Sequence, residues 1–263
     1  MANPSASADE LRRDLEGAIE RGEFRVEFQP MVKLGGGVVV GAEALIRWRH
    51  PRRGTIPPND FLPAAEQSGL IDRIDDYVLD AGARVAAGWP RSADRPGWLS
   101  VNVVPARFRQ PGTVTRMLGL VEAAGLQPDL LMVELTGGVT GDAQPIIAGL
   151  EEFRAAGVRV ALDDFGAATS MADLERLPVD MVKLAREFVA AVDGPAEESA
   201  IALSLINLAD ARGADVVAKG VESREQAWRL AELGCRYGQG FFFSKPIGAS
   251  GLLAVLRQGT LRG

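Results

Sequence analysis

The pattern of hydrophobic and polar positions changes between two periods along most of the chain. In short segments such as Phe24–Gln29, apolar and polar residues alternate, which is typical of β-strands. Longer segments such as Asp9–Arg21 have apolar residues about four positions apart, which is typical of amphipathic helices. The predicted strands are Phe24–Gln29, Val38–Trp48, Trp98–Val104, Leu130–Thr136, Val158–Asp164, Met181–Leu184, Asp215–Ala218 and Tyr237–Phe243. The predicted helices are Asp9–Arg21, Asp60–Ser68, Ile71–Ala87, Gly112–Ala124, Ala143–Ala156, Met171–Leu177, Ala196–Arg212, Ser223–Leu233 and Ala249–Leu256.

The order of these elements predicts an α/β fold. Strands that alternate with helices indicate parallel strands covered by helices. The first two strands are joined by a short turn at Gly35–Gly37, so we expect them to be antiparallel. Eight strands in this order predict a TIM-like (β/α)8 barrel with an antiparallel first strand. We expect residues 1–8 to form a disordered tail and residues 9–263 to form a single barrel domain.

Composition and charge narrow the function. With 29 Lys and Arg against 35 Asp and Glu, the net charge is −6, which argues against nucleic-acid or membrane binding as the main role. One cysteine, Cys235, and one histidine, His50, make a disulfide, a zinc site or a Ser-His-Asp triad improbable. A bound metal would therefore be held by oxygen atoms. No membrane-spanning stretch or signal peptide is visible, so we expect a cytoplasmic protein.

Polar side chains mark the ends of the predicted parallel strands, where barrel enzymes place their active sites. The adjacent carboxylates of Asp163 and Asp164 repel each other unless a cation lies between them. Taken alone, this pair could also be an acidic turn before a helix cap. The whole set of strand-end residues favours a site: Glu43, Asn102, Glu134, Asp163, Asp164, Lys183, Lys219 and Gln239.

Ordered motifs along the chain resemble those of the EAL domain family, whose members hydrolyse the bacterial second messenger cyclic di-GMP to linear pGpG. The resemblance extends from about Leu11 to Leu256. The matching segments are Glu43-Ala44-Leu45 with Arg47, Asn102, Glu134-Leu135-Thr136, Asp163-Asp164-Phe165-Gly166, Leu177-Pro178-Val179-Asp180 with Lys183, Gly220-Val221-Glu222, Gln239-Gly240 and Ser244-Lys245-Pro246.

The resemblance implies a role for each matching residue. One Mg²⁺ or Mn²⁺ ion would be held by Glu43, Asn102, Glu134 and Asp163. A second ion would be shared by Asp163, Asp164 and a glutamate of a Glu-Gly-Val-Glu segment, so that two ions activate a water and bind the scissile phosphate. If the protein is an enzyme, its catalytic residues are Glu43, Lys183 and Asp164. The expected ligand-binding residues are Gln29, Arg47, Lys219, Glu222 and Gln239.

The departures from the family pattern lie close to this chemistry. The glutamate expected as a ligand of the second metal is replaced by Lys219. An ammonium at ~4 Å from a dication costs about 8 kcal/mol of repulsion at an effective dielectric constant of about 20. We therefore expect at most one metal ion, or none, with Lys219 pairing with Asp164 and facing a ligand phosphate. Gly137 and Ala185 replace two further acidic residues, and the loop at Ala167–Ala172 differs from the family's.

Three hypotheses stay open at this point. The first is a degenerate EAL domain that binds cyclic di-GMP with little or no hydrolysis. The second is an active metal-dependent phosphodiesterase, and the third is an interaction module that no longer needs the ligand. Cyclic di-GMP, a protein partner and a second copy of the chain are the partners to consider. The basic run Arg47–Gly54 is expected to be a solvated loop with His50 at the surface, and one ring of Phe241–Phe243 could lie near the ligand.

Overall fold

The computed structural model describes residues 4–261, with side chains described from residue 10 on apart from residues 196–198. Nine strands form a single sheet in the order β1-β9-β8-β7-β6-β5-β4-β2-β3, and β1 also pairs with β2, which closes a barrel of eight strands with β3 outside it. The strands are β1 Phe24–Lys33, β2 Val38–His50, β3 Gly54–Ile56, β4 Trp98–Val103, β5 Leu131–Leu135, β6 Arg159–Phe165, β7 Met181–Leu184, β8 Asp215–Lys219 and β9 Tyr237–Gln239.

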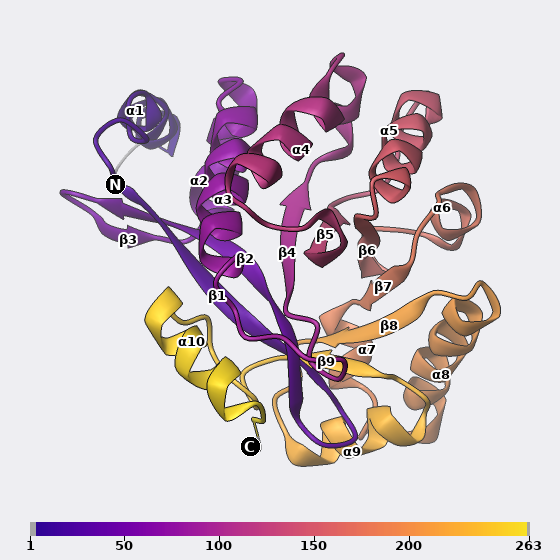
Figure 1. Ribbon diagram of the computed structural model, residues 1–263. Coiled ribbons are helices and arrows are strands. Elements are labelled where there is room, and N and C mark those ends of the chain that lie inside the picture. Colours follow the sequence, from indigo (N-terminus) through magenta and orange to yellow (C-terminus); the bar gives the residue numbers. More distant parts are fainter. Residues whose placement is uncertain (1–3, 262–263) are drawn as a thin grey trace.

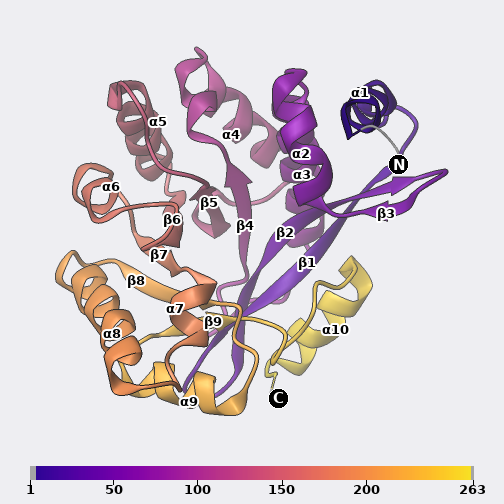
Figure 2. The ribbon, with the colours of Figure 1, turned by 180° about the vertical axis from the view of Figure 1, so that it is seen from behind.

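Helices surround the barrel on its outer side (Figures 1 and 2). The helices are α1 Pro4–Leu15, α2 Pro58–Gln67, α3 Ile71–Ala86, α4 Thr113–Ala123, α5 Gln144–Ala155, α6 Met171–Arg176, α7 Arg186–Ala190, α8 Ala196–Ala211, α9 Arg224–Glu232 and α10 Ala249–Gln258, with 3-10 turns η1 Pro105–Arg109 and η2 Pro128–Leu130. None of the helices in the described part of the chain has the length and apolarity needed to cross a membrane.

The predicted barrel with an antiparallel first strand is confirmed. Strand β1 runs antiparallel to both of its neighbours, β2 and β9. Strand β2 pairs in parallel with β4, and the parallel pairing continues from β4 through β9. The antiparallel start follows from the short turn between β1 and β2, because a parallel pair needs a long crossover connection.

Several predicted boundaries are wrong. The first helix ends at Leu15, because Gly17 adopts a positive φ of 76° that ends the helical turn. This helix begins at Pro4, inside the segment predicted to be a disordered tail, while residues 1–3 lie outside the described residues. The last strand stops at Gln239 rather than Phe243. A Cβ at Gly240 would lie 2.1 Å from the Val221 carbonyl oxygen, so the chain turns there through a position that only glycine can occupy.

One apolar side chain from each barrel strand fills the lower part of the barrel. These eight residues form one buried cluster: Met31, Val40, Trp98, Met132, Ala161, Met181, Val217 and Tyr237. Because side chains alternate between the two faces of a strand, the residue two positions further along points into the barrel again. Glu134, Asp163, Lys183 and Lys219 each follow a member of this cluster by two positions. The strand pattern therefore brings the polar residues together inside the barrel, directly above this apolar cluster.

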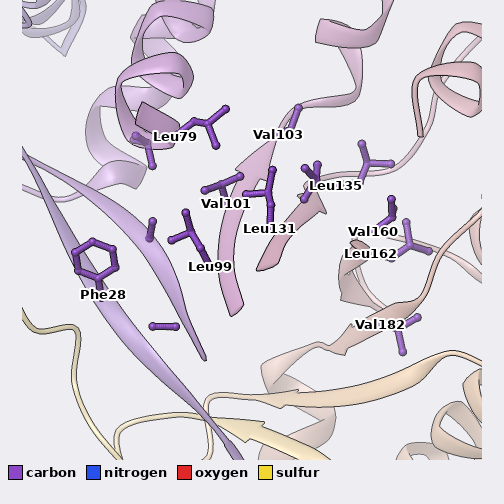
Figure 3. Close-up of a cluster of buried hydrophobic side chains, with 14 of the residues drawn as sticks. Phe28, Leu79, Leu99, Val101, Val103, Leu131, Leu135, Val160, Leu162 and Val182 are labelled. Carbon is purple, nitrogen blue, oxygen red and sulfur yellow. The ribbon is translucent and has the colours of Figure 1, made fainter. Parts of the chain in front are cut away.

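The second part of the core lies between the strands and the helices. Leu99 and Val101 of β4 face α3, which carries Leu79, as Figure 3 shows. All three side chains are at most 2% exposed. Burying each of them stabilises the fold by about 1.5–3 kcal/mol relative to leaving it in water. This outer layer fixes the strand positions and so holds the barrel mouth in place.

Candidate functional site

A β-bulge turns Glu43 into the barrel. Along β2, the register with β1 shifts so that Met31 faces Gly41 and Val32 faces Val39, which leaves Val40 as an extra residue. A bulge of this kind changes which face the following residues occupy. Glu43 stands three positions after Val40, so strict alternation would turn its side chain away from the barrel. Because of the bulge, its side chain instead lies among the polar residues above the apolar cluster. The acid in the middle of an apolar strand is thereby explained.

Lys183 lies at the centre of the buried part of the site. Its ammonium donates to Glu43 Oε2 at 2.7 Å and to both oxygens of Glu134 at 2.7 Å. The Glu134 and Lys183 side chains are fully buried, so each charge depends on these partners. Asn102 Nδ2 and Gln239 Nε2 donate to the two oxygens of Glu43 at 2.8 and 2.9 Å. Leaving one partner of such a buried ion pair alone typically costs about 3–5 kcal/mol.

Glu43 and Glu134 both contact the Lys183 ammonium, but their pKa values shift in opposite directions. Burial opposes the charge on Glu43, but the Lys183 ammonium and the Asn102 amide lower the pKa of Glu43 below its ordinary value. Burial and the negative charge of Glu43 raise the pKa of Glu134. Burial also opposes the charge on Lys183, but the carboxylates of Glu134 and Glu43 raise the pKa of Lys183. Lys183 therefore stays charged and serves to hold these two acids together.

Lys219 occupies the space between the two aspartates. Its ammonium donates to Asp163 Oδ1 at 2.6 Å and to Asp164 Oδ1 at 2.7 Å. Burial and the nearby Lys183 oppose its charge, but Asp163 and Asp164 raise the pKa of Lys219 above its ordinary value. The pairing predicted for Lys219 and Asp164 is present in the structure, and Asp163 shares it.

Asp164 has an unusual backbone conformation. Its φ is +48°, and it is the one non-glycine residue with a positive φ within the described residues. Aspartate tolerates this region better than most residues do. The Asp164 carbonyl accepts hydrogen bonds from three successive amides, those of residues 167, 168 and 169, and Thr169 Oγ1 donates to the Asp163 carbonyl at 2.7 Å. The altered loop is thus folded tightly beneath the two carboxylates.

A cleft of about 640 Å³ opens above these residues and extends beneath α2 and α3. Of the predicted site residues, those that line it are Gln29, Glu43, Arg47, Asn102, Asp163, Asp164 and Lys219. Gln239 and Glu222 line an adjoining recess of about 110 Å³. Glu134 and Lys183 line neither space, because they lie deeper. The structure therefore brings all the predicted residues to one end of the barrel, in two layers.

The oxygen atoms of Glu43, Asn102, Glu134 and Asp163 are of the kind that a hard cation such as Mg²⁺ or Mn²⁺ takes as ligands, but Lys183 and Lys219 bind the three carboxylates in this arrangement. The four carboxylates of the site exceed its two ammonium groups by two charges, which one divalent ion would balance. The Lys219 ammonium binds both Asp163 and Asp164 and so occupies the position between these two carboxylates. Within the described residues, no group of three or more Asp, Glu, His or Cys side chains is arranged to hold a metal ion.

Sequence reasoning missed a buried charge cluster beside the cleft. The Arg107 side chain is fully buried, and its Nη1 lies 3.5 Å from Asp75 Oδ2 while Asp76 and Asp72 contact its other nitrogens. Burial raises the pKa of Asp75 to about 7, and the two neighbouring aspartates add to this while Arg107 opposes it. The spacing of the three aspartates, at positions 72, 75 and 76 on one helix face, was the available signal.

The basic run Arg47–Gly54 is not the solvated loop that we predicted. Strand β2 continues to His50 and forms a hairpin with β3. His50 is 4% exposed, and its Nε2 lies 3.0 Å from Asp14 Oδ2 of α1. The expectation that His50 lies at the surface is therefore wrong. A distant helix covers it, and the local sequence gives no sign of that contact.

Comparisons with known proteins agree with the motifs. The family model of the EAL domain matches residues 12–246. An uncharacterized protein of Mycobacterium tuberculosis is 35% identical over 264 residues, which cover 94% of this chain and 86% of that protein. The cyclic di-GMP phosphodiesterase RocR of Pseudomonas aeruginosa is 34% identical over 236 residues, which cover 89% of this chain and 60% of that protein.

Two solved structures are similar to this chain in both fold and sequence. The MucR phosphodiesterase in complex with c-di-GMP superimposes with a TM-score of 0.85 at 34% identity, over 92% of this chain and 99% of that chain. The EAL enzyme Bd1971, in a form with cAMP and cyclic di-GMP bound, superimposes with a TM-score of 0.90 at 28% identity, over 97% of this chain and 70% of that chain.

Proposed function

The chain belongs to the EAL domain family, and from this premise we propose that it binds cyclic di-GMP with little or no hydrolysis. The observation that carries the proposal is the position of the Lys219 ammonium, 2.6 Å from Asp163 and 2.7 Å from Asp164. Two-metal hydrolysis places a cation at such a carboxylate pair. An ammonium supplies a positive charge there, but it cannot supply a metal-bound hydroxide.

The retained residues support ligand binding. Lys219 is a point-charge partner for a phosphate. Gln29 and Arg47 line the cleft, and the Arg47 guanidinium is held 2.9 Å from Glu27. The Phe241 ring is 55% exposed at the mouth of the cleft, and such a ring is a surface on which a purine base can stack. These groups match an anionic ligand with aromatic bases. Cyclic di-GMP is such a ligand: RocR is a cyclic di-GMP phosphodiesterase, and the MucR structure is a c-di-GMP complex.

At most one divalent cation enters this proposal. Glu43, Asn102, Glu134 and Asp163 would hold it, and it would polarise a phosphate oxygen when bound. Hydrolysis would in addition require Glu43, Lys183 and Asp164 to act on a water. In this chain Lys183 holds Glu43 and Glu134, and Asp164 is paired with Lys219. The predicted cytoplasmic location, protein partner and homodimer are not tested by these contacts and stay predictions.

The test combines calorimetric titration of cyclic di-GMP with a hydrolysis assay in Mg²⁺ or Mn²⁺, using Glu43→Ala as the catalytic control. We expect measurable binding and no turnover above that control. Turnover above it would overturn the proposal in favour of an active phosphodiesterase. Absence of binding with and without the metal would overturn it in favour of a ligand-independent module, whose partner would be indifferent to Arg47→Ala.

A further inference from the structure

Arg186 lies at the mouth of the site, although its sequence position gave no sign of a role. It follows the end of β7 by two residues and begins α7. Its side chain runs across Gly220, next to Lys219. A Cβ at Gly220 would lie 2.8 Å from Arg186 Cγ and 3.1 Å from its Cδ, and the φ of Gly220 is +74°. The glycine therefore leaves room for the arginine stem to pass over the end of β8.

The Arg186 guanidinium is without a counter-charge. Among the described residues, it makes no hydrogen bond or ion pair with another side chain or with the backbone. The residue before it is Ala185, which has no carboxylate, and the nearby Asp163 and Asp164 are already paired with Lys219. An exposed guanidinium beside an anion-binding site is a ready partner for a ligand anion.

Arg186 and Lys219 face the same space. Both line the recess of about 110 Å³, and the carboxylates of Glu43 and Glu222 line it as well. Both also line the main cleft, so the recess and the cleft are continuous. A guanidinium can donate two parallel hydrogen bonds to the oxygens of one phosphate, while an ammonium acts as a point charge. Glu43 is already bound by Lys183 and Gln239, so the Arg186 guanidinium, next to the Lys219 ammonium, is available for a single phosphate group.

We propose that Arg186 and Lys219 bind the same phosphodiester group of cyclic di-GMP, and that this pair takes the place of a two-cation phosphate site. This inference rests on the proposed function and adds a binding residue to it. On this proposal the second phosphodiester of the ligand contacts neither of these two side chains. Arg186 thus determines affinity through one of the two phosphates only.

The test compares dissociation constants for cyclic di-GMP by calorimetry. Arg186→Ala is expected to weaken binding about 10- to 100-fold, as for a lost charge-assisted hydrogen bond, and Arg186→Lys by less. Arg229→Ala on α9, whose guanidinium pairs with Glu232 away from the cleft, is the matched control and should leave binding unchanged. Thermal unfolding of each variant checks that the fold is intact.

Phosphorus NMR then tells which phosphate is involved. In the complex the two phosphates of the ligand give separate signals, and Arg186→Ala and Lys219→Met should shift the same one. The double variant should lose less affinity than the two single losses combined, because the two residues share one group. Unchanged binding by Arg186→Ala, or shifts of different signals with additive losses, would overturn the inference alone. Absence of binding by the unsubstituted protein would overturn the proposed function as well.

Discussion

Lys219→Glu is the substitution that most directly tests how this site handles cations. It removes the ammonium between Asp163 and Asp164 and adds a carboxylate in its place. The Lys219 side chain is only 15% exposed, so the exchange of charge takes place largely away from solvent. We expect the variant to bind a divalent cation that the unsubstituted protein binds weakly, and to be less stable than the unsubstituted protein when no metal is present.

The expected gain in metal affinity follows from the charges. An ammonium at ~4 Å repels a dication by about 8 kcal/mol at a dielectric constant of about 20, and side-chain movement reduces this. A gain of about 100-fold in Mn²⁺ affinity, or about 2.7 kcal/mol, is therefore a conservative expectation. Without metal, the lost ion pairs should lower the free energy of unfolding by about 3–5 kcal/mol. For a chain of this size, each kcal/mol shifts the Tm by about 2–4 °C.

The assay is thermal unfolding in EDTA and in a series of Mn²⁺ concentrations, with calorimetric titration of Mn²⁺ at fixed temperature. The variant should unfold about 6–20 °C below the unsubstituted protein in EDTA. At a Mn²⁺ concentration of about 100 times its Kd, the Tm should rise by about 5–11 °C. Lys219→Arg keeps the positive charge and should show no such rise, and Lys219→Met should lie between the two.

A Tm of Lys219→Glu that does not respond to Mn²⁺ would refute the reasoning, because the ammonium would then not be what limits metal binding. Equal Mn²⁺ affinities of the unsubstituted protein and of Lys219→Glu would refute it too, because Lys219 would then not weaken metal binding. Hydrolysis need not return in the variant, because Gly137 and Ala185 still lack the acids of the family pattern.

Three further predictions concern stability. Because the pKa of Asp75 is raised to about 7, the folded state keeps its proton while the unfolded state loses it, so stability falls as pH rises from about 4 to 7. In urea unfolding near pH 4, the free energy of unfolding of Asp75→Asn should therefore equal that of the unsubstituted protein. Near pH 8 it should be higher by a few kcal/mol, at about 1.4 kcal/mol per pKa unit. Equal stability at both pH values would contradict this. Arg107→Leu leaves three buried or half-buried carboxylates without their cation and should lower the free energy of unfolding in urea by about 3–5 kcal/mol. Gly240→Ala forces a Cβ to 2.1 Å from the Val221 oxygen and should cost about 1–3 kcal/mol in the same assay, whereas a loss below about 0.5 would show that the turn can move.

The sequence predicted the parts of the fold that depend on local pattern. Strand alternation and the rule that barrel sites lie at strand ends placed Glu43, Asp163 and Lys219 in one cluster, and the exchange of a glutamate for Lys219 predicted its pairing with Asp164. These inferences succeed because side-chain direction along a strand has a fixed period of two. The bulge that turns Glu43 inward could not be read from β2 alone, because it depends on the register with β1.

The features of the site that could not be predicted from the sequence depend on contacts between segments far apart in the chain. Lys183 bridges Glu43 and Glu134 beneath the cleft, and this pairing depends on three strands that only the closed barrel brings together. His50 is buried by α1, whose residues give no sign of that contact. Arg186 has no motif of its own, and its place beside Lys219 follows from the neighbouring register of β7 and β8.

The antiparallel strand that closes the barrel has a consequence for how the chain folds. Lys33 of β1 pairs with Tyr237 of β9, so the ring closes only when residues about two hundred positions apart meet. Closing so long a loop is slow, because its conformational entropy must be lost before the new contacts form. During synthesis β1 and β2 can pair early as a hairpin, while β1 keeps one unpaired edge until β9 emerges from the ribosome. Glu43 then receives its bond from Gln239 last, so the site is completed only as the fold is.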